Sequence, residues 1–300
     1  MRATIMRAPG DVVVTEVDRP EIIEPTDAII ELAAACICGS DLWPYRGYDK
    51  AENRAMGHEY VGTVVEVGSD VTTVKPGDFV VGSFCISDNT CEICDSGYQS
   101  RCVNGGFVSG TQAELVRIPQ ADGTLVVVPG GRPGDPDVLA SLLATSDVLG
   151  TGWFGAVAAE AGPGKTVAVV GDGAVGLLAI LAAKELGAER IIAMSRNPQR
   201  QAVAKEFGAT DIVEERGEEG VSRVKDLTNG LGAHSVVEAV GVAWMLGIGR
   251  FGGIAGSFLV ADLTARQMNL PRHLRCRRHC CTHRHGDTSF EQHLRMCPQG

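Results

Sequence analysis

Three features are scarce in this sequence: aromatic residues, basic residues and uninterrupted apolar runs. Aromatic side chains make up 5% of the 300 residues, which disfavours an aromatic-rich β-sandwich. Asp and Glu outnumber Lys and Arg by 37 to 27, and the formal net charge is -10. Because an acidic chain lacks the clustered cations that neutralise phosphates, we expect no nucleic-acid partner.

No segment has the pattern of a targeting or membrane sequence. The first ten residues contain no apolar core and no small-residue cleavage site, which argues against a secretory signal. The most apolar late stretch, residues 242–260, is interrupted by Arg250 and several glycines and is therefore a poor membrane span. We expect a cytoplasmic protein with no membrane partner.

Glycine and cysteine, by contrast, are plentiful. The 38 glycines favour tight turns and close backbone approaches, as in nucleotide-binding α/β proteins. Ten cysteines in a reducing compartment indicate metal ligands before disulfides.

The residue pattern divides the chain into two parts. Up to about residue 130, short β-branched runs between Gly and Pro turns predict a mostly antiparallel β domain. Its expected strands are 11–17, 27–35, 60–67, 79–81, 113–118 and 124–128. A helical connection is expected at 139–161. Strands then alternate with helices, which indicates a parallel sheet. These strands are 166–170, 190–194, 211–213 and 235–240, and the helices are 177–186 and 199–207.

A glycine loop opens the second part. The segment from Gly171 to Gly176 fits the pattern Gly-x-Gly-x-x-Gly between an expected buried strand and an expected helix. In that context Gly171 makes the tight turn, Gly173 lets the backbone approach a pyrophosphate, and Gly176 lets the helix pack on the strand. The positive end of the helix then faces the phosphates. We interpret the loop as a dinucleotide-binding site; the alternative is a glycine-rich turn without a ligand.

The end of the next strand bears on the choice of coenzyme. An NAD-binding fold places an acidic residue there to accept a hydrogen bond from the ribose 2′-hydroxyl. This sequence has Ser195 and Arg196 instead, with Arg200 one turn further on. Because a hydroxyl and guanidinium groups can bind a 2′-phosphate, we predict NADP rather than NAD. The alternative is that both arginines are solvated surface residues.

A zinc site is expected where three separate segments converge. Cys38 and His58 stand 20 residues apart, each beside a glycine, and Asp147 lies in the segment that connects the two parts. Sulfur, nitrogen and oxygen ligands of these types bind zinc, and a thiolate with a carboxylate neutralises its charge. Three protein ligands leave a fourth position open, which is typical of catalytic zinc.

Several motifs along residues 1–241 together resemble the zinc-containing alcohol dehydrogenases of the medium-chain dehydrogenase/reductase superfamily. They are Cys38-Gly39-Ser40-Asp41, Gly57-His58-Glu59-Tyr60-Val61-Gly62 with Gly68 and Val71, Lys75-Pro76-Gly77-Asp78-Phe79-Val80, Asp147-Val148-Leu149-Gly150-Thr151-Gly152 and the glycine loop. The resemblance implies an α/β fold, with a GroES-like, mostly-β catalytic domain and a Rossmann coenzyme domain. It further implies a zinc-dependent oxidoreductase that transfers a hydride between an alcohol or aldehyde and NADP.

The resemblance also implies how the catalytic zinc is held. Cys38, His58 and Asp147 would be its ligands, with Asp in the third place as in a subset of the family. Glu59 would be an occasional fourth ligand, or would support the ligands without binding the metal itself. Ser40 would take the place of the hydroxyl that relays the substrate proton toward solvent.

The remaining implications concern the coenzyme, the substrate and the assembly. Thr151 would contact the nicotinamide. The substrate would be a small alcohol or aldehyde. The residue pattern leaves open whether Trp43, Trp153 and Phe154 line its pocket or belong to the core. Members of the family are normally homodimers or homotetramers.

A second set of cysteines, Cys91, Cys94 and Cys102, resembles the four-cysteine structural zinc lobe of the same family. Asp88 stands where the family has its first cysteine. The fourth ligand is either Asp88 or Cys85, which lies slightly upstream. We favour Asp88 because it keeps the spacing of the family. A zinc-free lobe with three reduced thiols is the remaining alternative.

The sequence departs from the family pattern at about residue 242. We expect a catalytic domain at 1–153, an incomplete Rossmann domain at 154–262 and an atypical, disordered tail at 263–300. Residues 271–300 hold six Arg, five of the seven His and four of the ten Cys. We interpret this end as truncated or out-of-frame coding sequence, which argues against the usual oligomer because its edge strand is missing. The alternative function is a catalytically impaired remnant that retains zinc and partial nucleotide binding.

Overall fold

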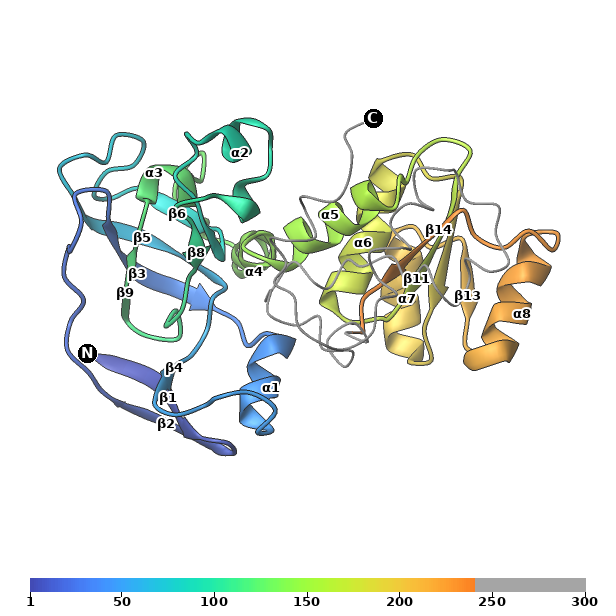
Figure 1. Cartoon of the computed structure of the whole chain (residues 1–300), viewed down its shortest axis with the longest axis horizontal. Helices are drawn as coiled ribbons and strands as arrows, with labels where there is room; N and C mark the ends of the chain where they lie inside the picture. Colours follow the sequence, from blue (N-terminus) through green and yellow to red (C-terminus); the bar gives the residue numbers. More distant parts are fainter. Residues whose placement is uncertain (241–300) are drawn as a thin grey trace, which may run out of the picture.

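The computed structural model describes residues 1–240, which form two halves (Figure 1). The first half is rich in strands, and the second alternates strands with helices. This arrangement matches the α/β architecture that the sequence predicts. The expected tail at 263–300 and the last part of the expected Rossmann domain, including a possible strand at 252–260, lie outside the described residues.

The first half consists of antiparallel strands joined by short helical turns. The strands are β1 (Arg2–Ala8), β2 (Asp11–Glu16), β3 (Ala28–Ala35), β4 (Arg54–Ala55), β5 (Tyr60–Val67), β6 (Phe79–Gly82), β7 (Cys85–Ile86), β8 (Gly106–Phe107), β9 (Leu115–Ile118) and β10 (Leu125–Val127). The turns are η1 (Gly39–Asp41), α1 (Leu42–Tyr45), α2 (Glu92–Asp95), η2 (Gln99–Arg101) and α3 (Ala121–Thr124).

One five-stranded sheet carries the core of this half. Its order is β10-β6-β5-β3-β9, and two smaller sheets, β2-β1-β4 and β7-β8, lie beside it. Tyr60, Val64 and Val80 of this sheet pack with Ile30 and Ile118 in one buried cluster. Because each such side chain contributes roughly 1.5–3 kcal/mol when buried, the apolar runs decide which segments become central strands. Strands β1, β4, β7 and β8 were not predicted, since they are short or interrupted by polar residues.

The second half is a doubly wound parallel sheet. Its strands are β11 (Thr166–Val170), β12 (Arg190–Met194), β13 (Asp211–Val213) and β14 (Ser235–Glu238), in the order β13-β12-β11-β14. Helices α5 (Val148–Ala158), α6 (Ala174–Glu185) and α7 (Pro198–Phe207) pack on one face, and α8 (Gly217–Leu227) packs on the other. Along β11 the side chains alternate between these faces, with Val167 and Val169 on one and Ala168 on the other. Helix α8 was not predicted because two glycines and two glutamates open it.

The predicted helical connection at 139–161 is interrupted in the middle. It forms α4 (Pro136–Thr145) and α5, and the expected domain boundary after residue 153 lies inside α5. Leu143 of α4 packs against the first half, whereas Ala156 of α5 packs against α6. Ser146 and Asp147 form the joint, because short polar side chains favour helix ends over helix interiors. The joint therefore sits where the two halves meet.

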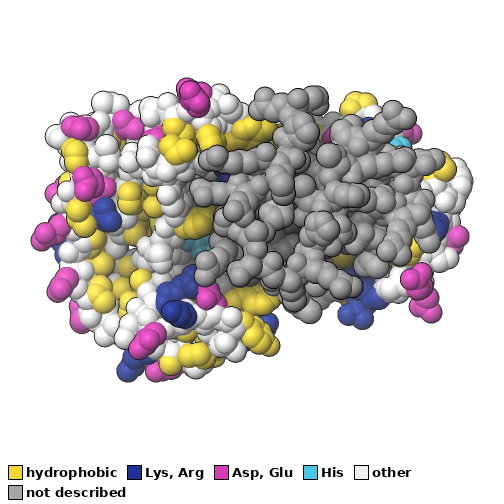
Figure 2. Space-filling model, viewed as in Figure 1, with side chains coloured by type: hydrophobic (Ala, Val, Ile, Leu, Met, Phe, Trp, Pro, Cys, Tyr) yellow, Lys and Arg dark blue, Asp and Glu magenta, His cyan; other side chains and the backbone are white. Residues whose placement is uncertain are grey.

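Acidic side chains are frequent on the described surface. Figure 2 shows Asp and Glu side chains spread around the outline of the strand-rich half, in keeping with the negative net charge. None of the helices within residues 1–240 is both long enough and apolar enough to cross a membrane.

Candidate metal centres and coenzyme site

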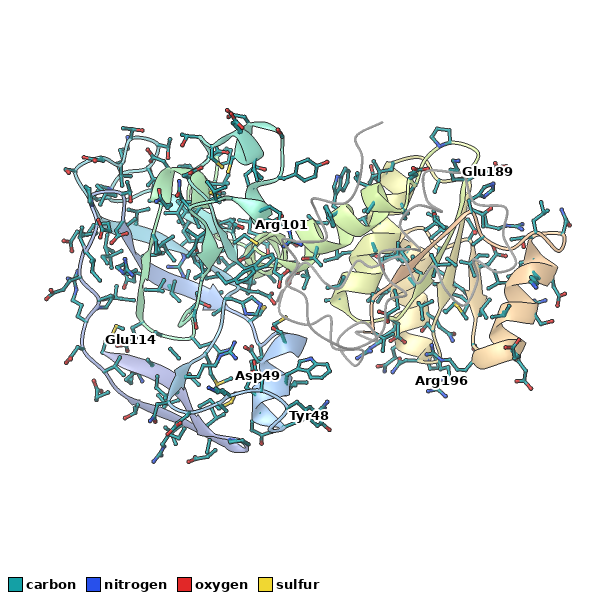
Figure 3. All side chains as sticks on the ribbon, in the orientation of Figure 1. Tyr48, Asp49, Arg101, Glu114, Glu189 and Arg196 are labelled. Carbon is teal, nitrogen blue, oxygen red and sulfur yellow. The ribbon has the colours of Figure 1, made fainter. Side chains whose placement is uncertain are left out.

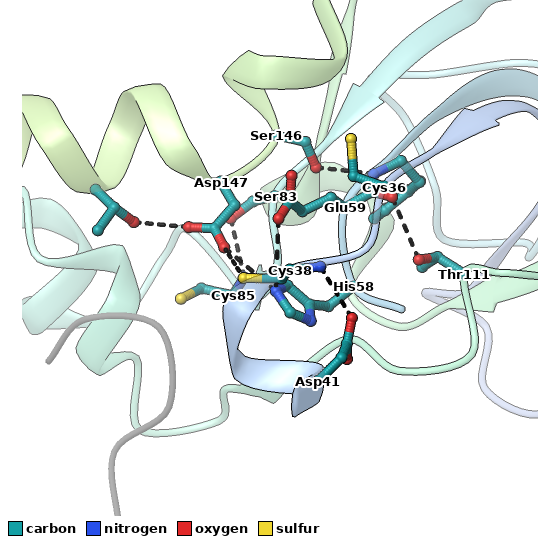
Figure 4. Close-up of polar contacts among 12 residues, drawn as sticks. Cys36, Cys38, Asp41, His58, Glu59, Ser83, Cys85, Thr111, Ser146 and Asp147 are labelled. Atoms are coloured by element: carbon teal, nitrogen blue, oxygen red, sulfur yellow. Dashed lines mark hydrogen bonds and ion pairs between the residues drawn. The ribbon is translucent and has the colours of Figure 1, made fainter. Parts of the chain in front are cut away.

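Four ligand-type side chains meet at the joint between the halves (Figure 4). One donor atom each from Cys38, His58, Glu59 and Asp147 lies within 4.8 Å of the others. His58 Nε2 is 3.2 Å from Asp147 Oδ2, and Cys38 Sγ is 3.9 Å from the same oxygen. These are the residues that the sequence and the resemblance proposed for the catalytic zinc. The structure brings all four together.

Local backbone geometry orients the first two candidate ligands, Cys38 and His58. Cys38 caps the turn η1, and its backbone N–H donates to Asp41 Oδ2 at 3.0 Å. His58 follows Gly57, whose φ of +89° favours glycine. A Cβ at Gly57 would also come within 2.7 Å of Gln112 and Thr111. The glycine in this motif is therefore required by both conformation and space.

Two hydroxyls that the metal-site prediction did not use fix the third ligand. Ser146 Oγ accepts from the backbone N–H of Tyr60 at 3.0 Å and donates to the carbonyl of Gly82 at 2.6 Å, which ties the joint to β5 and β6. Thr151 Oγ1 donates to Asp147 Oδ1 at 2.7 Å. The i,i+4 spacing of Asp147 and Thr151 at a helix start could have indicated the second contact.

The electrostatics of the cluster favour a bound cation. Burial raises the pKa of Glu59, and the Asp147 carboxylate raises it further. Burial lowers the pKa of His58, but hydrogen bonds with Asp147 and Cys38 raise it more, to about 10. Without a metal, a proton on His58 balances the acidic groups. A divalent cation would displace that proton and stabilise the ionised ligands, so this donor set fits zinc.

Ser40 lies in η1, two residues past Cys38, and is partly exposed. Its hydroxyl makes no hydrogen bond with another residue in the described range. The position next to a ligand is compatible with the relay role that the resemblance implies, and that role remains a prediction.

Removing the Thr151 hydroxyl is expected to loosen the metal. In Thr151→Val the Asp147 carboxylate loses the donor that orients it, and affinity for zinc should fall about 10- to 100-fold, the usual cost of losing a partner of a metal ligand. Competition with a chelator measures the loss. Thr151→Ser keeps the hydroxyl and should retain the metal like the unmodified chain. Equal zinc retention by Thr151→Val would contradict the orienting role.

A second group of ligand-type side chains lies in the lobe around α2. Donor atoms of Asp88, Cys91, Cys94 and Cys102 lie within 4.8 Å of one another. Cys91 Sγ is 3.9 Å from Cys102 Sγ, and the backbone N–H of Asp88 donates to Cys102 Sγ at 3.3 Å. Three cysteines and a carboxylate in this arrangement fit a closed, four-ligand zinc site.

The structure separates the two candidates for the fourth ligand of this lobe. Asp88 accepts hydrogen bonds from the backbone of Thr90 and from the side chain of Asn104, and these lower its pKa. An ionised carboxylate therefore faces the three cysteines. Cys85 is buried at the other cluster, where burial and the nearby Asp147 raise its pKa to about 12.

The glycine loop has the shape that the sequence predicts. Gly171 has φ +112°, and a Cβ at Gly176 would lie 2.2 Å from the Gly171 carbonyl oxygen, so helix and loop touch there. Gly173 caps α6, and no atom lies within 4 Å of where its Cβ would be. Open space at a helix N-terminus fits a coenzyme pyrophosphate.

The three residues predicted to bind a 2′-phosphate lie in different surroundings. Ser195 is buried at the end of β12, and Arg200 lies on α7. Both contact Asp172: Ser195 Oγ donates to Asp172 Oδ2 at 2.8 Å, and Arg200 pairs with Asp172 Oδ1 at 3.0 Å. Arg196 points outward and is exposed (Figure 3). The sequence reading missed Asp172, which stands between two of the loop glycines.

Comparisons with known proteins agree with this fold. The family model described as alcohol dehydrogenase GroES-like domain matches residues 24–130, and the model described as zinc-binding dehydrogenase matches residues 174–247. Zinc-type alcohol dehydrogenase B of Aspergillus flavus is 38% identical over 256 residues, which cover 81% of this chain and 59% of that protein. A medium chain reductase/dehydrogenase of Acremonium sp is 36% identical, over 80% of this chain and 86% of the relative.

A solved structure shows the same architecture. The alcohol dehydrogenase TADH from Thermus sp. ATN1 matches with a TM-score of 0.71 and 37% identity, over 83% of this chain and 73% of that chain. The chain belongs to the zinc-type medium-chain dehydrogenase/reductase family, which confirms the family and the fold class predicted from its motifs. It spans 59% of the length of the Aspergillus flavus relative.

Proposed function

We propose that the chain acts as a zinc- and NADP-dependent oxidoreductase that interconverts alcohols and aldehydes. The observation that carries the proposal is the convergence of Cys38, His58 and Asp147 at the joint between a GroES-like half and a nucleotide-binding half. Asp147 directly precedes α5, the helix that packs with the sheet of the coenzyme half. The names of the relatives, which are alcohol and medium-chain dehydrogenases, support the same reaction class.

Each residue then has a defined task. Zinc supplies a Lewis acid and the nicotinamide supplies the hydride acceptor when both are bound. Cys38, His58 and Asp147 hold the metal, with the buried Glu59 beside them as an occasional ligand. Ser40 takes up the hydroxyl proton of the substrate and passes it toward solvent.

The coenzyme half supplies the remaining contacts. Gly171, Gly173 and Gly176 shape the pyrophosphate loop, and Thr151 contacts the nicotinamide from the start of α5. The absence of an acidic residue at position 195, with Arg196 and Arg200 close by in sequence, supports NADP over NAD. The second zinc, held by Asp88 and the three lobe cysteines, is structural.

A metal count combined with coenzyme titrations tests the proposal. The full chain should contain two zinc ions, bind NADPH with a change in nicotinamide fluorescence, and oxidise a small alcohol with a lower KM for NADP than for NAD. Equal KM values, or a lower value for NAD, would refute the NADP assignment. Stoichiometric zinc and NADPH binding without oxidation of any alcohol in a panel would instead identify an impaired remnant.

A further inference from the structure

Asp172 occupies a place that its sequence position does not reveal. It lies in the glycine loop, directly before Gly173, yet its carboxylate engages two groups expected to bind a 2′-phosphate. Ser195 Oγ donates to Asp172 Oδ2 at 2.8 Å, and Arg200 pairs with Asp172 Oδ1 at 3.0 Å. Because Ser195 is 1% exposed, its hydroxyl has few other directions in which to donate.

Strand adjacency explains how a loop residue reaches this point. β11 and β12 are parallel neighbours, with Val170 opposite Met194, so their carboxyl ends lie side by side. Asp172 stands two residues past Val170, and Ser195 stands one residue past Met194. A carboxylate at the end of the second strand is what accepts the ribose 2′-hydroxyl of NAD in this fold. Here the glycine loop, which follows β11, supplies a carboxylate at this place through Asp172.

The charge state of Asp172 is settled by its partners. Partial burial raises the pKa of this carboxyl, but hydrogen bonds from Ser195 and Arg200 lower it by more, so the net shift is downward. The Asp172 side chain is 19% exposed, which leaves part of the carboxylate facing solvent. A ligand that approaches the loop at this strand end therefore meets a negative charge.

The two coenzymes respond to that charge in opposite ways. A 2′-phosphate carries close to two negative charges and must draw Arg200 and Ser195 away from a carboxylate that it also repels. A 2′-hydroxyl has no charge and can donate a hydrogen bond to the same carboxylate. The ion pair between Arg200 and Asp172 thus reduces the gain in affinity that a 2′-phosphate has over a 2′-hydroxyl.

We propose that Asp172 is a specificity-determining residue of the coenzyme pocket, which restrains the preference for a 2′-phosphate and allows a 2′-hydroxyl to bind. The proposal rests on the proposed function to the extent that the glycine loop binds a dinucleotide. The proposal assigns part of the discrimination between NADP and NAD to the glycine loop, whereas the sequence alone places that discrimination at the end of β12.

Calorimetric titration of the full chain with adenosine 2′,5′-bisphosphate and with 5′-AMP tests the assignment without any turnover. In Asp172→Asn the Kd of the bisphosphate should fall about tenfold and that of AMP should rise a few-fold, because the variant removes the charge and keeps the shape. Asp172→Ala should change the ratio in the same direction, which covers the case that the asparagine variant folds poorly.

A matched control exists in the same sheet. Asp211 also accepts from a hydroxyl, Thr210 Oγ1 at 2.7 Å, and pairs with an arginine, Arg190 at 3.3 Å. These residues lie at the amino ends of β12 and β13, away from the glycine loop. Asp211→Asn should therefore leave both Kd values unchanged.

The outcomes separate this inference from the NADP assignment. An unchanged ratio in Asp172→Asn, or weaker bisphosphate binding, would overturn the role of Asp172, even if the unmodified chain prefers the bisphosphate. An unmodified chain that prefers AMP, with the preference reversed or reduced in Asp172→Asn, would support Asp172 and refute the NADP preference. Binding of neither ligand would overturn both.

Discussion

Replacing Cys38 with alanine is expected to lower the zinc content from two ions per chain to one and to reduce alcohol oxidation by roughly 10³-fold or more. Cys38 carries the sulfur atom of the cluster, 3.9 Å from Asp147 Oδ2, and is the proposed sulfur ligand. Without the thiolate, two buried carboxylates and an imidazole remain, a weaker set for zinc. Lewis-acid stabilisation worth about 4 kcal/mol corresponds to that loss of rate.

Elemental analysis and initial rates measure the effect, and Cys36→Ala provides the control. Cys36 is only two residues away and partly buried, but it is not among the four residues of the cluster. Its replacement should leave two zinc ions in place. Retention of both zinc ions by Cys38→Ala would show that the cluster does not bind metal through this cysteine.

In the lobe, Asp88→Ala is expected to release the second zinc and to lower the Tm by on the order of 10 °C. A structural metal contributes directly to folding, and a loss of about 3 kcal/mol corresponds to roughly 6–12 °C in a domain of this size. We expect the lobe to depend on the metal because its regular structure, within the described residues, is limited to the short turns α2 and η2 and the pair β7-β8. The zinc at the Cys38 cluster should remain.

Two further variants make this result specific. Asp88→Cys restores a fourth sulfur ligand and should keep two zinc ions, whereas Cys85→Ala tests the alternative that the sequence left open. Cys85 lies near Asp147 but is not among the four residues of either cluster, so its replacement should also leave two zinc ions. A loss of zinc in Cys85→Ala together with full zinc in Asp88→Ala would reverse the assignment.

Much of the fold could be predicted because its signals are local. The expected bounds of β5, β11, β12 and β13 coincide with those observed, since each is an apolar run closed by turn residues. The glycine loop was equally predictable, because each of its three glycines is required by a local feature: the tight turn, the start of the helix, or the packing of the helix on the strand. By contrast, β1 and α8 were not predicted. Polar residues interrupt β1, and α8 opens with glycines and glutamates, although its Val224 and Leu227 pack on the parallel sheet.

The candidate metal ligands could be predicted from their residue types and motifs, but the hydrogen-bond partners that hold them in place could not. Cys38 and His58 stand in recognisable motifs, but nothing in the chain order shows that Ser146 ties the joint to β5 and β6. Such contacts join residues more than 60 positions apart, and the packing of α4 on one half and of α5 on the other decides them.

The sequence by itself therefore determined the family, the two-part α/β architecture and the kinds of ligand present, because these depend on motifs and local periodicity. The tertiary structure alone decided that Asp88 rather than Cys85 faces the lobe cysteines, and that Asp172 reaches Ser195 and Arg200. Both depend on which loop ends lie side by side once the sheets have formed. Strand order and the path of the loops fix that proximity. Residue spacing favoured Asp88 over Cys85 but left both possible, and it gave no sign of the contacts of Asp172.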